Sequence, residues 1–238
     1  MTASWPEQRR GGLVATALAR AEGWLLEPAA PAPRVVAERP APPRPVVAVV
    51  GLGRRCGTTT VARGLAVELA RRDPAGAALV SAGSLPGGSA LATGGARRLA
   101  RALGGRPVGR LALVAAEDPA LRQLAVDRPA PLVLDVGHGT PPEGALALAD
   151  RAVLVASPEV EPALAGVAAR ALARDGVAPL VVLNRALEVA EWSEPAAAVV
   201  GESRLGARLA LAGRDPVGPL RAALETIADG CLEVVAGA

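Results

Sequence analysis

The chain has 238 residues, enough for one main domain with a full hydrophobic core and an appendage. Hydrophobic residues make up 51% of it, nearly all of them Ala, Val and Leu, and all 26 cationic side chains are arginines because the sequence contains no lysine. The net charge is +3, but the arginines are scattered along the chain and the only Phe, Trp or Tyr residues are three Trp, which argues against a nucleic-acid-binding surface. The two cysteines are widely spaced and make no disulfide or metal framework.

The first 45 residues differ from the rest in composition. A helix is predicted over Gly12–Leu26, and its apolar face consists of Val14, Leu18, Ala21 and Leu25. Residues 27–45 are rich in proline, which prevents helix and central strand and predicts a stiff linker. We therefore divide the chain into an N-terminal arm with a short helix (1–26), the linker (27–45) and a main domain (46–238). Whether the apolar helix face packs on that domain or docks to a partner or a membrane surface stays open.

From residue 46 onward, apolar runs alternate with helical patterns, an order typical of βαβ units and a parallel sheet. The apolar runs show no alternation, because both faces of such a sheet are covered. The predicted strands are Val46–Val50, Ala77–Ser81, Leu111–Val114, Pro131–Val136, Ala152–Ala156, Pro179–Leu183 and a short one at Ala197–Val200. The predicted helices are Thr59–Arg72, Ser89–Leu103, Pro119–Asp127, Glu161–Asp175, Arg204–Ala212 and Pro219–Ala228. The fold class is α/β, with a doubly wound, mainly parallel sheet of about seven strands and helices on both faces.

The first predicted strand passes through a glycine-rich turn, Gly51 to Gly57, into the first predicted helix. This is the layout of a phosphate-binding loop, GxxxxGK[ST], in which backbone N–H groups hold phosphate, the Lys neutralises its charge and the Ser or Thr binds Mg²⁺. The lysine is missing, because Thr58 follows the last glycine. The same glycines also fit a loosely spaced dinucleotide fingerprint, GxGxxxG, so an NAD(P)-binding Rossmann protein is an alternative.

A second motif ends the strand predicted at Pro131–Val136. Asp135 follows a hydrophobic run, the position of a carboxylate that orients Mg²⁺ or its water. His138, the sole histidine, is expected to cap the turn that follows. Two more candidate motif segments follow the loop and Asp135 in chain order: Ala149–Glu159 and the pair Asn184-Arg185.

These segments together resemble the MinD/ParA family of deviant-Walker P-loop NTPases (SIMIBI class), which includes the TadZ and CpaE localisation proteins of bacterial pilus systems. The resemblance covers about residues 46–229. The family loop reads KGGxGKTT, and in that register Gly53 to Thr60 form the loop of this chain. The resemblance implies that Thr59 and Asp135 bind Mg²⁺ and that Asn184 and Arg185 lie on the adenine side.

The chain departs from the family at three charged positions. Thr58 and Gly53 stand where the family has its two loop lysines, and the second strand ends at Ser81 without the family's acid pair. Loss of one such contact typically costs about 10²–10³ in rate, so we expect a degenerate loop with little or no ATP hydrolysis. The alternative is an active ATPase that uses Arg54 or Arg55 in place of the lysines, because guanidinium grips phosphate bidentately.

The resulting hypothesis is a pseudo-ATPase or very weak ATPase that binds ATP or ADP with Mg²⁺ and acts as a positioning or assembly factor for a pilus, secretion or division apparatus. We expect a protein partner, recruited through the N-terminal helix, and a homodimer, but no nucleic acid. No segment reaches the ~20 apolar residues of a membrane span, so we expect a cytoplasmic protein recruited to a membrane-associated complex. The predicted nucleotide-binding residues are Gly53, Arg54, Arg55, Cys56, Gly57, Thr58, Thr59, Thr60, Asn184 and Arg185.

Overall fold

The computed structural model describes residues 44–81, 88–115, 118–138, 144–186 and 196–236. The chain divides into two units, Met1–Ala41 and Pro42–Ala238. The first unit lies outside the described residues, so the N-terminal helix and nearly all of the proline-rich linker stay predictions. Everything that follows concerns the second unit.

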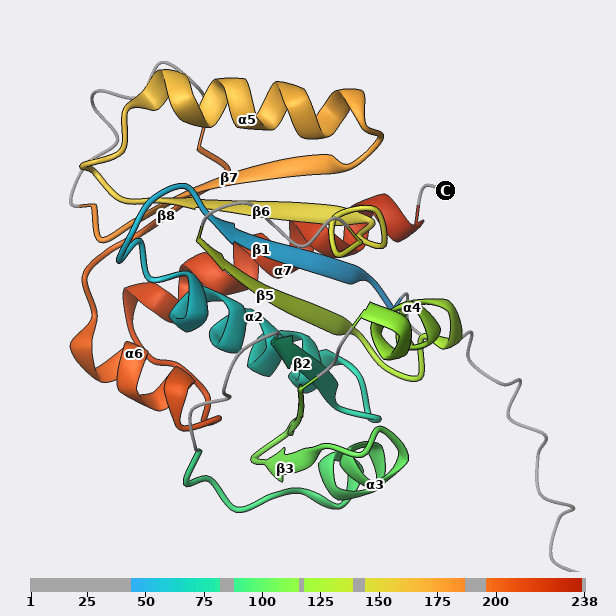
Figure 1. Cartoon of the computed structure of the whole chain (residues 1–238). Coiled ribbons are helices and arrows are strands. Elements are labelled where there is room, and N and C mark those ends of the chain that lie inside the picture. Colours follow the sequence, from blue (N-terminus) through green and yellow to red (C-terminus); the bar gives the residue numbers. More distant parts are fainter. Residues whose placement is uncertain (1–43, 82–87, 116–117, 139–143, 187–195, 237–238) are drawn as a thin grey trace, which may run out of the picture. The chain divides into compact units, whose positions relative to one another are not determined.

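One eight-stranded sheet forms the centre of this unit, in the order β3-β4-β2-β5-β1-β6-β7-β8 (Figure 1). Its described strands all pair in parallel except β3, which is antiparallel to β4 at one edge. Their bounds are β1 Val46–Gly51, β2 Ala77–Ser81, β3 Arg106–Val108, β4 Leu111–Ala115, β5 Leu132–His138, β6 Arg151–Ala156, β7 Ala178–Asn184 and β8 Ala198–Val200.

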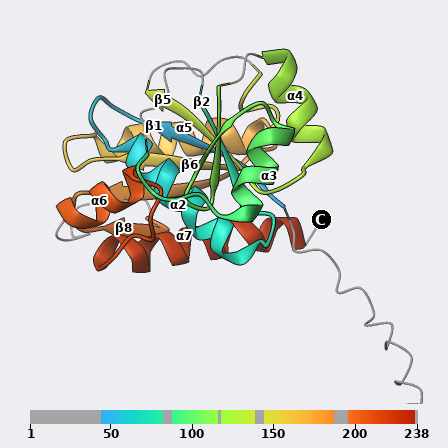
Figure 2. The same ribbon diagram turned by 90° about the horizontal axis from the view of Figure 1, so that it is seen from below.

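Helices cover both faces of the sheet, as Figures 1 and 2 show. One face carries α2 (Thr58–Arg72), α6 (Arg204–Leu211) and α7 (Pro219–Ala236), and the other carries α3 (Gly94–Ala102), α4 (Asp118–Asp127) and α5 (Pro162–Arg174). Alternate residues of one strand therefore enter different cores: Val47 and Val49 pack beneath α2, whereas Val46 and Ala48 pack beneath α3 and α4. This burial on both sides explains why the strands are apolar throughout.

The predicted fold class is confirmed, and each of the seven predicted strands is present within two residues at either end. The eighth strand, β3, was not predicted, because Arg106-Pro107-Val108 carries no apolar run and proline is accepted only at a sheet edge. Helix α3 begins at Gly94 rather than Ser89, since the Thr93 hydroxyl caps it by accepting from the Ala96 N–H at 3.2 Å. Helix α7 continues past Ala228 to Ala236.

A group of ion pairs joins the end of α2 to α7. Glu68 is 4% exposed, and its carboxylate accepts from Arg71 at 2.8 and 3.0 Å and from Arg72 at 2.7 Å. Arg72 continues to Asp229 on α7. Burial by itself would raise the pKa of Glu68, but the hydrogen bonds from Arg71 and Arg72 outweigh it and hold that pKa below its usual 4.5. The pairs therefore fix α7 against the helix that carries the glycine-rich loop.

Replacing Glu68 by Gln is expected to lower the free energy of unfolding by about 1–3 kcal/mol at pH 7, because two arginines lose their charged acceptor. The folded-state pKa is depressed, so the contribution is fully present above the unfolded pKa and disappears as pH falls through the folded one. Urea unfolding of both proteins from pH 7 to pH 3 measures this. Glu233→Gln, at an exposed position of α7, is the control. A Glu68→Gln loss that is constant with pH would contradict the ion-pair explanation.

Candidate functional site

The glycine-rich loop leaves β1 at Gly51 and enters α2 at Thr58. Two of its glycines are crowded by neighbouring side chains. A Cβ on Gly51 would lie 2.3 Å from Thr58 Oγ1, and a Cβ on Gly57 would lie 2.2 Å from Asn184 Nδ2. Gly57 also has φ +81°, in the left-handed region that side chains disfavour. The loop can therefore turn tightly against both the helix and the end of β7.

Three contacts fasten the loop to neighbouring strand ends. The Asn184 amide donates to the Cys56 carbonyl at 2.7 Å, and both residues are buried. The Cys56 thiol donates to Ser157 Oγ at 3.7 Å, and the Leu52 N–H donates to the Val155 carbonyl at 2.9 Å. Because β6 and β7 supply these partners, the loop keeps its shape without a ligand.

The start of α2 faces a hollow of about 220 Å³. No side chain in the described part of the chain caps this 15-residue helix, and its first turn contains no acidic residue. Its first N–H groups and its positive dipole end are therefore available to an anion. The lining residues are Gly53, Arg55, Cys56, Gly57, Thr58, Thr59, Thr60, Gly137 and His138.

A second hollow of about 150 Å³ continues from the first, since Gly57 and Thr60 line both. It is bounded by Asn184 and Arg185 at the end of β7 and by residues 200–204 after β8. The Arg185 N–H donates to the Val200 carbonyl at 2.7 Å, which holds this wall in place. The two hollows together form a groove along the carboxyl ends of β1 and β7, where ligands bind in open α/β sheets.

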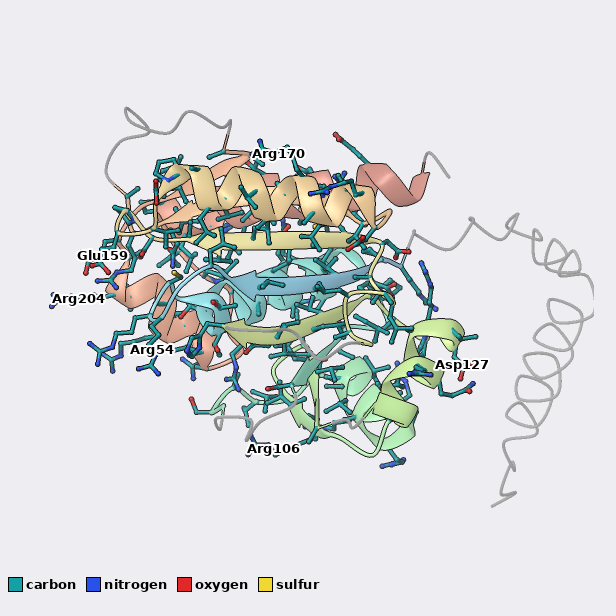
Figure 3. All side chains as sticks on the ribbon, turned by 45° about the horizontal axis from the view of Figure 1, so that its top comes forward. Arg54, Arg106, Asp127, Glu159, Arg170 and Arg204 are labelled. Atoms are coloured by element: carbon teal, nitrogen blue, oxygen red, sulfur yellow. The ribbon has the colours of Figure 1, made fainter. Side chains whose placement is uncertain are left out.

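The structure brings nine of the ten predicted nucleotide-binding residues to this groove; the exception is Arg54. The Arg54 side chain is exposed and extends outward from the loop (Figure 3). Its neighbour Arg55 is also exposed, with φ +59°, but lines the first hollow. Any direct contact of the loop arginines with a bound phosphate therefore falls to Arg55.

Asp135 lies on β5 opposite Val49, at the point where the β1–β5 register shifts. Such a bulge re-aims side chains beside functional sites. The carboxylate accepts hydrogen bonds from the Thr59 side chain and the Gly137 N–H. Its Oδ1 is buried without a partner among the described residues. Burial raises the pKa of Asp135 despite those hydrogen bonds and the charge of Arg63.

A hydroxyl and an orphaned carboxylate oxygen suit a hard cation, so the predicted pair Thr59 and Asp135 fits Mg²⁺ chemically. In the described ranges no three His, Cys, Asp or Glu side chains gather into a metal cluster, so further ligands would come from phosphate and water.

The charged groups missing from the sequence have no substitute at equivalent places in the described residues. The Thr58 hydroxyl points back toward Gly51, and β2 ends at Ser81 without a carboxylate. A Rossmann protein would need an acid at that strand end to hold a ribose, so the NAD(P) alternative lacks its characteristic contact.

Two residues of this region were not predicted as part of the site. His138 is the last residue of β5, pairs with Gly51 and lines the first hollow, and the turn that it is expected to cap lies outside the described residues. The strand continues past Asp135 because Gly137, at φ +75°, accommodates the bulge. Arg63, fully buried on α2, gave no sequence signal other than a charge on an apolar helix face.

Comparison with solved structures identifies proteins of the same fold. A ParA family ATPase from Chlorobium tepidum matches with a TM-score of 0.57 at 12% identity, over 78% of this chain and 97% of that one. The cell division protein MinD of Aquifex aeolicus matches with a TM-score of 0.56 at 16% identity, over 79% and 97%. A complex of MinC and MinD from Aquifex aeolicus matches with a TM-score of 0.53 at 16% identity, over 79% of this chain and 96% of that one. No protein-family model and no curated protein matches the sequence. The chain therefore has the fold of the ParA and MinD ATPases.

Gly57→Ala is expected to destabilise the protein more than Gly176→Ala, its matched control. The two glycines have nearly the same φ, +81° and +82°, but a Cβ on Gly176 would meet no described atom within 4 Å. Both changes cost about 1–2 kcal/mol of backbone strain, and Gly57→Ala adds about 1 kcal/mol or more by displacing Asn184 from Cys56. Urea unfolding gives the two losses, and hydrogen exchange of the loop amides locates them. Equal losses would show that the Asn184 contact does not hold the loop.

Proposed function

We propose that this chain is a nucleotide-binding protein with the ParA/MinD fold that hydrolyses ATP very slowly or not at all and serves as a positioning or assembly factor for a pilus, secretion or division apparatus. The observation that carries the proposal is a loop of intact shape, with an uncapped helix end, that has no lysine and no carboxylate at the end of β2. A shaped anion site without catalytic charges is suited to binding rather than turnover.

In this proposal the phosphates of the nucleotide bind in the first hollow and its base in the second. The loop amides and the N-terminus of α2 receive the phosphates, with Arg55 and His138 at the rim. The second hollow, beside Asn184 and Arg185, receives the base side. If a magnesium ion binds with the phosphates, Thr59 and Asp135 would be its oxygen donors.

Hydrolysis is a different requirement, because phosphoryl transfer needs charge on the transferred group and an oriented water. This chain has uncharged residues, Gly53, Thr58 and Ser81, at the positions where charged side chains would supply both. An active ATPase that relies on Arg55 is the second candidate, favoured by the presence of this residue at the first hollow. The exposed position of Arg55 leaves its charge screened by water, which weakens that candidate.

The positioning role follows from what such a binding site can do in a complex. One of the solved structures of the same fold is a complex of MinD with MinC, which supports a protein partner for this fold. We propose that nucleotide binding favours one conformation of this chain for its partner, and that a homodimer depends less on ATP because Gly53 offers no cross-reaching lysine. In the part of the chain that the structure describes, no helix has the length and apolar character needed to cross a bilayer.

Calorimetry is expected to show binding of ADP and ATP and no binding of NAD or NADP. Arg55→Ala should weaken ADP binding roughly 3–10-fold, because a charge-assisted contact at the rim is lost. Arg54→Ala is a matched control, since it removes the same charge from the adjacent position outside the hollow. Equal effects of the two changes would show that Arg55 attracts ADP only through the overall charge of the loop and makes no direct contact. Binding of NAD(P) alone would contradict the proposal and favour the Rossmann alternative.

ATP turnover by the purified full chain is expected to stay below ~1 min⁻¹, because the transition state lacks its stabilising charges. Phosphate release over several hours measures this. A faster rate that disappears in Arg55→Ala would establish the active ATPase instead, and Arg54→Ala again serves as the comparison.

A further inference from the structure

Arg63 is a charge on α2 that is buried among the packed elements. Its side chain is 1% exposed. The surrounding residues of the helix are apolar and equally buried: Val61, Ala62, Leu65, Ala66 and Leu69. An ionised group in such a place is costly unless the protein supplies partners of opposite charge. The partners of Arg63 therefore indicate what its charge does.

One partner holds the guanidinium in position. Nη1 donates to the carbonyl of Leu211, the last residue of α6. Carbonyls at a helix C-terminus lack partners within the helix and carry its negative dipole end, so they suit a cation. Arginine also keeps its proton at any ordinary pH. Arg63 is thus a fixed positive charge anchored to α6.

Asp135 is a second group that attracts the charge of Arg63. Thr59 and Arg63 are four residues apart on α2 and therefore lie on the same side of the helix, one turn from each other. Asp135 faces that side, because it lies opposite Val49, which packs beneath α2, and because it accepts a hydrogen bond from Thr59. Burial lowers the pKa of Arg63 and raises that of Asp135, and the attraction between the two charges opposes both shifts.

We infer that Arg63 is a built-in cation at the candidate magnesium site, where it weakens divalent-metal binding by Thr59 and Asp135 and makes phosphate binding at the loop nearly independent of metal. A fixed positive charge compensates the carboxylate that would attract Mg²⁺ and also repels the ion directly. Both effects are strong because buried charges are poorly screened. Arg106, from the edge strand β3, adds further positive potential around Arg63.

The phosphate half of this inference rests on the proposed function, whereas the metal half stands on Arg63 and Asp135 alone. Mn²⁺, followed by electron paramagnetic resonance, is the probe for nucleotide-free full-length protein. We expect the wild type to bind Mn²⁺ more weakly than ~1 mM, the weak end of protein sites for hard divalent cations. Tighter binding that Asp135→Asn abolishes would overturn the inference, and this measurement does not require any change at Arg63.

Arg63→Met then removes the charge and keeps most of the volume. We expect this variant to bind Mn²⁺ at least tenfold more tightly than the wild type, and the gain to vanish in Arg63→Met with Asp135→Asn. Arg97→Gln is the control, because it removes one exposed arginine on α3, across the sheet from Arg63. Folding of every variant is checked by circular dichroism and thermal melting. An unchanged Mn²⁺ affinity in folded Arg63→Met would overturn the inference.

ADP binding to the wild type, measured by calorimetry in Mg²⁺ and in EDTA, tests the phosphate half. We expect the two affinities to agree within about threefold. An affinity at least tenfold higher in Mg²⁺ would overturn the inference while leaving the proposed function intact. If ADP binds under neither condition, the proposed function fails, and the Mn²⁺ measurements still decide the role of Arg63.

Discussion

The hydrogen bond from the Asn184 amide to the Cys56 carbonyl, closed beneath Gly57, is the constraint on which the candidate site depends. It ties the end of β7 to the loop that follows β1, across the intervening strand β6. The left-handed backbone of Gly57 lets the amide approach, and the same turn leaves the first N–H groups of α2 uncapped. A loop held in this way by its own fold does not need a lysine or a bound phosphate to keep its shape. This explains how the loop keeps its turn although Gly53 and Thr58 carry no charge.

Charge inside the domain is concentrated on one helix. Helix α2 carries two buried ionisable residues, Arg63 and, nearer its end, Glu68, and each is linked to other elements. Glu68 binds arginines that reach α7, whereas Arg63 contacts the end of α6 and faces β5. Buried pairs add little net stability but penalise any arrangement that separates them. They therefore fix α2, and with it the loop, relative to the helices packed on the same face.

The sequence predicted the fold well because burial on both faces makes every parallel strand an uninterrupted apolar run, as in Val46–Val50. The edge strand β3 escaped prediction for the opposite reason, since Arg106 and Pro107 lie where only one side is covered. Gly57 was located from the glycine-rich motif and Thr59 from the register of the family that the loop resembles, and both line the groove. His138 and Arg63 were not located, because the first depends on a register shift between β1 and β5 and the second on where α6 ends against α2. Such contacts between distant segments leave no local pattern.

Binding and hydrolysis of a nucleotide are distributed differently over a phosphate loop. Affinity for phosphate is shared among several backbone N–H groups and a helix dipole, none of which depends on side-chain identity. Rate acceleration is concentrated in a few charges aimed at the transferred group, so substitution at Gly53 and Thr58 removes much of it at once. Under the proposed function, the bound state would then end by dissociation of the nucleotide and not by its cleavage. The lifetime of the complex with a partner would follow the concentration of free nucleotide and the affinity of the groove, which makes the chain a sensor of occupancy rather than a timed switch.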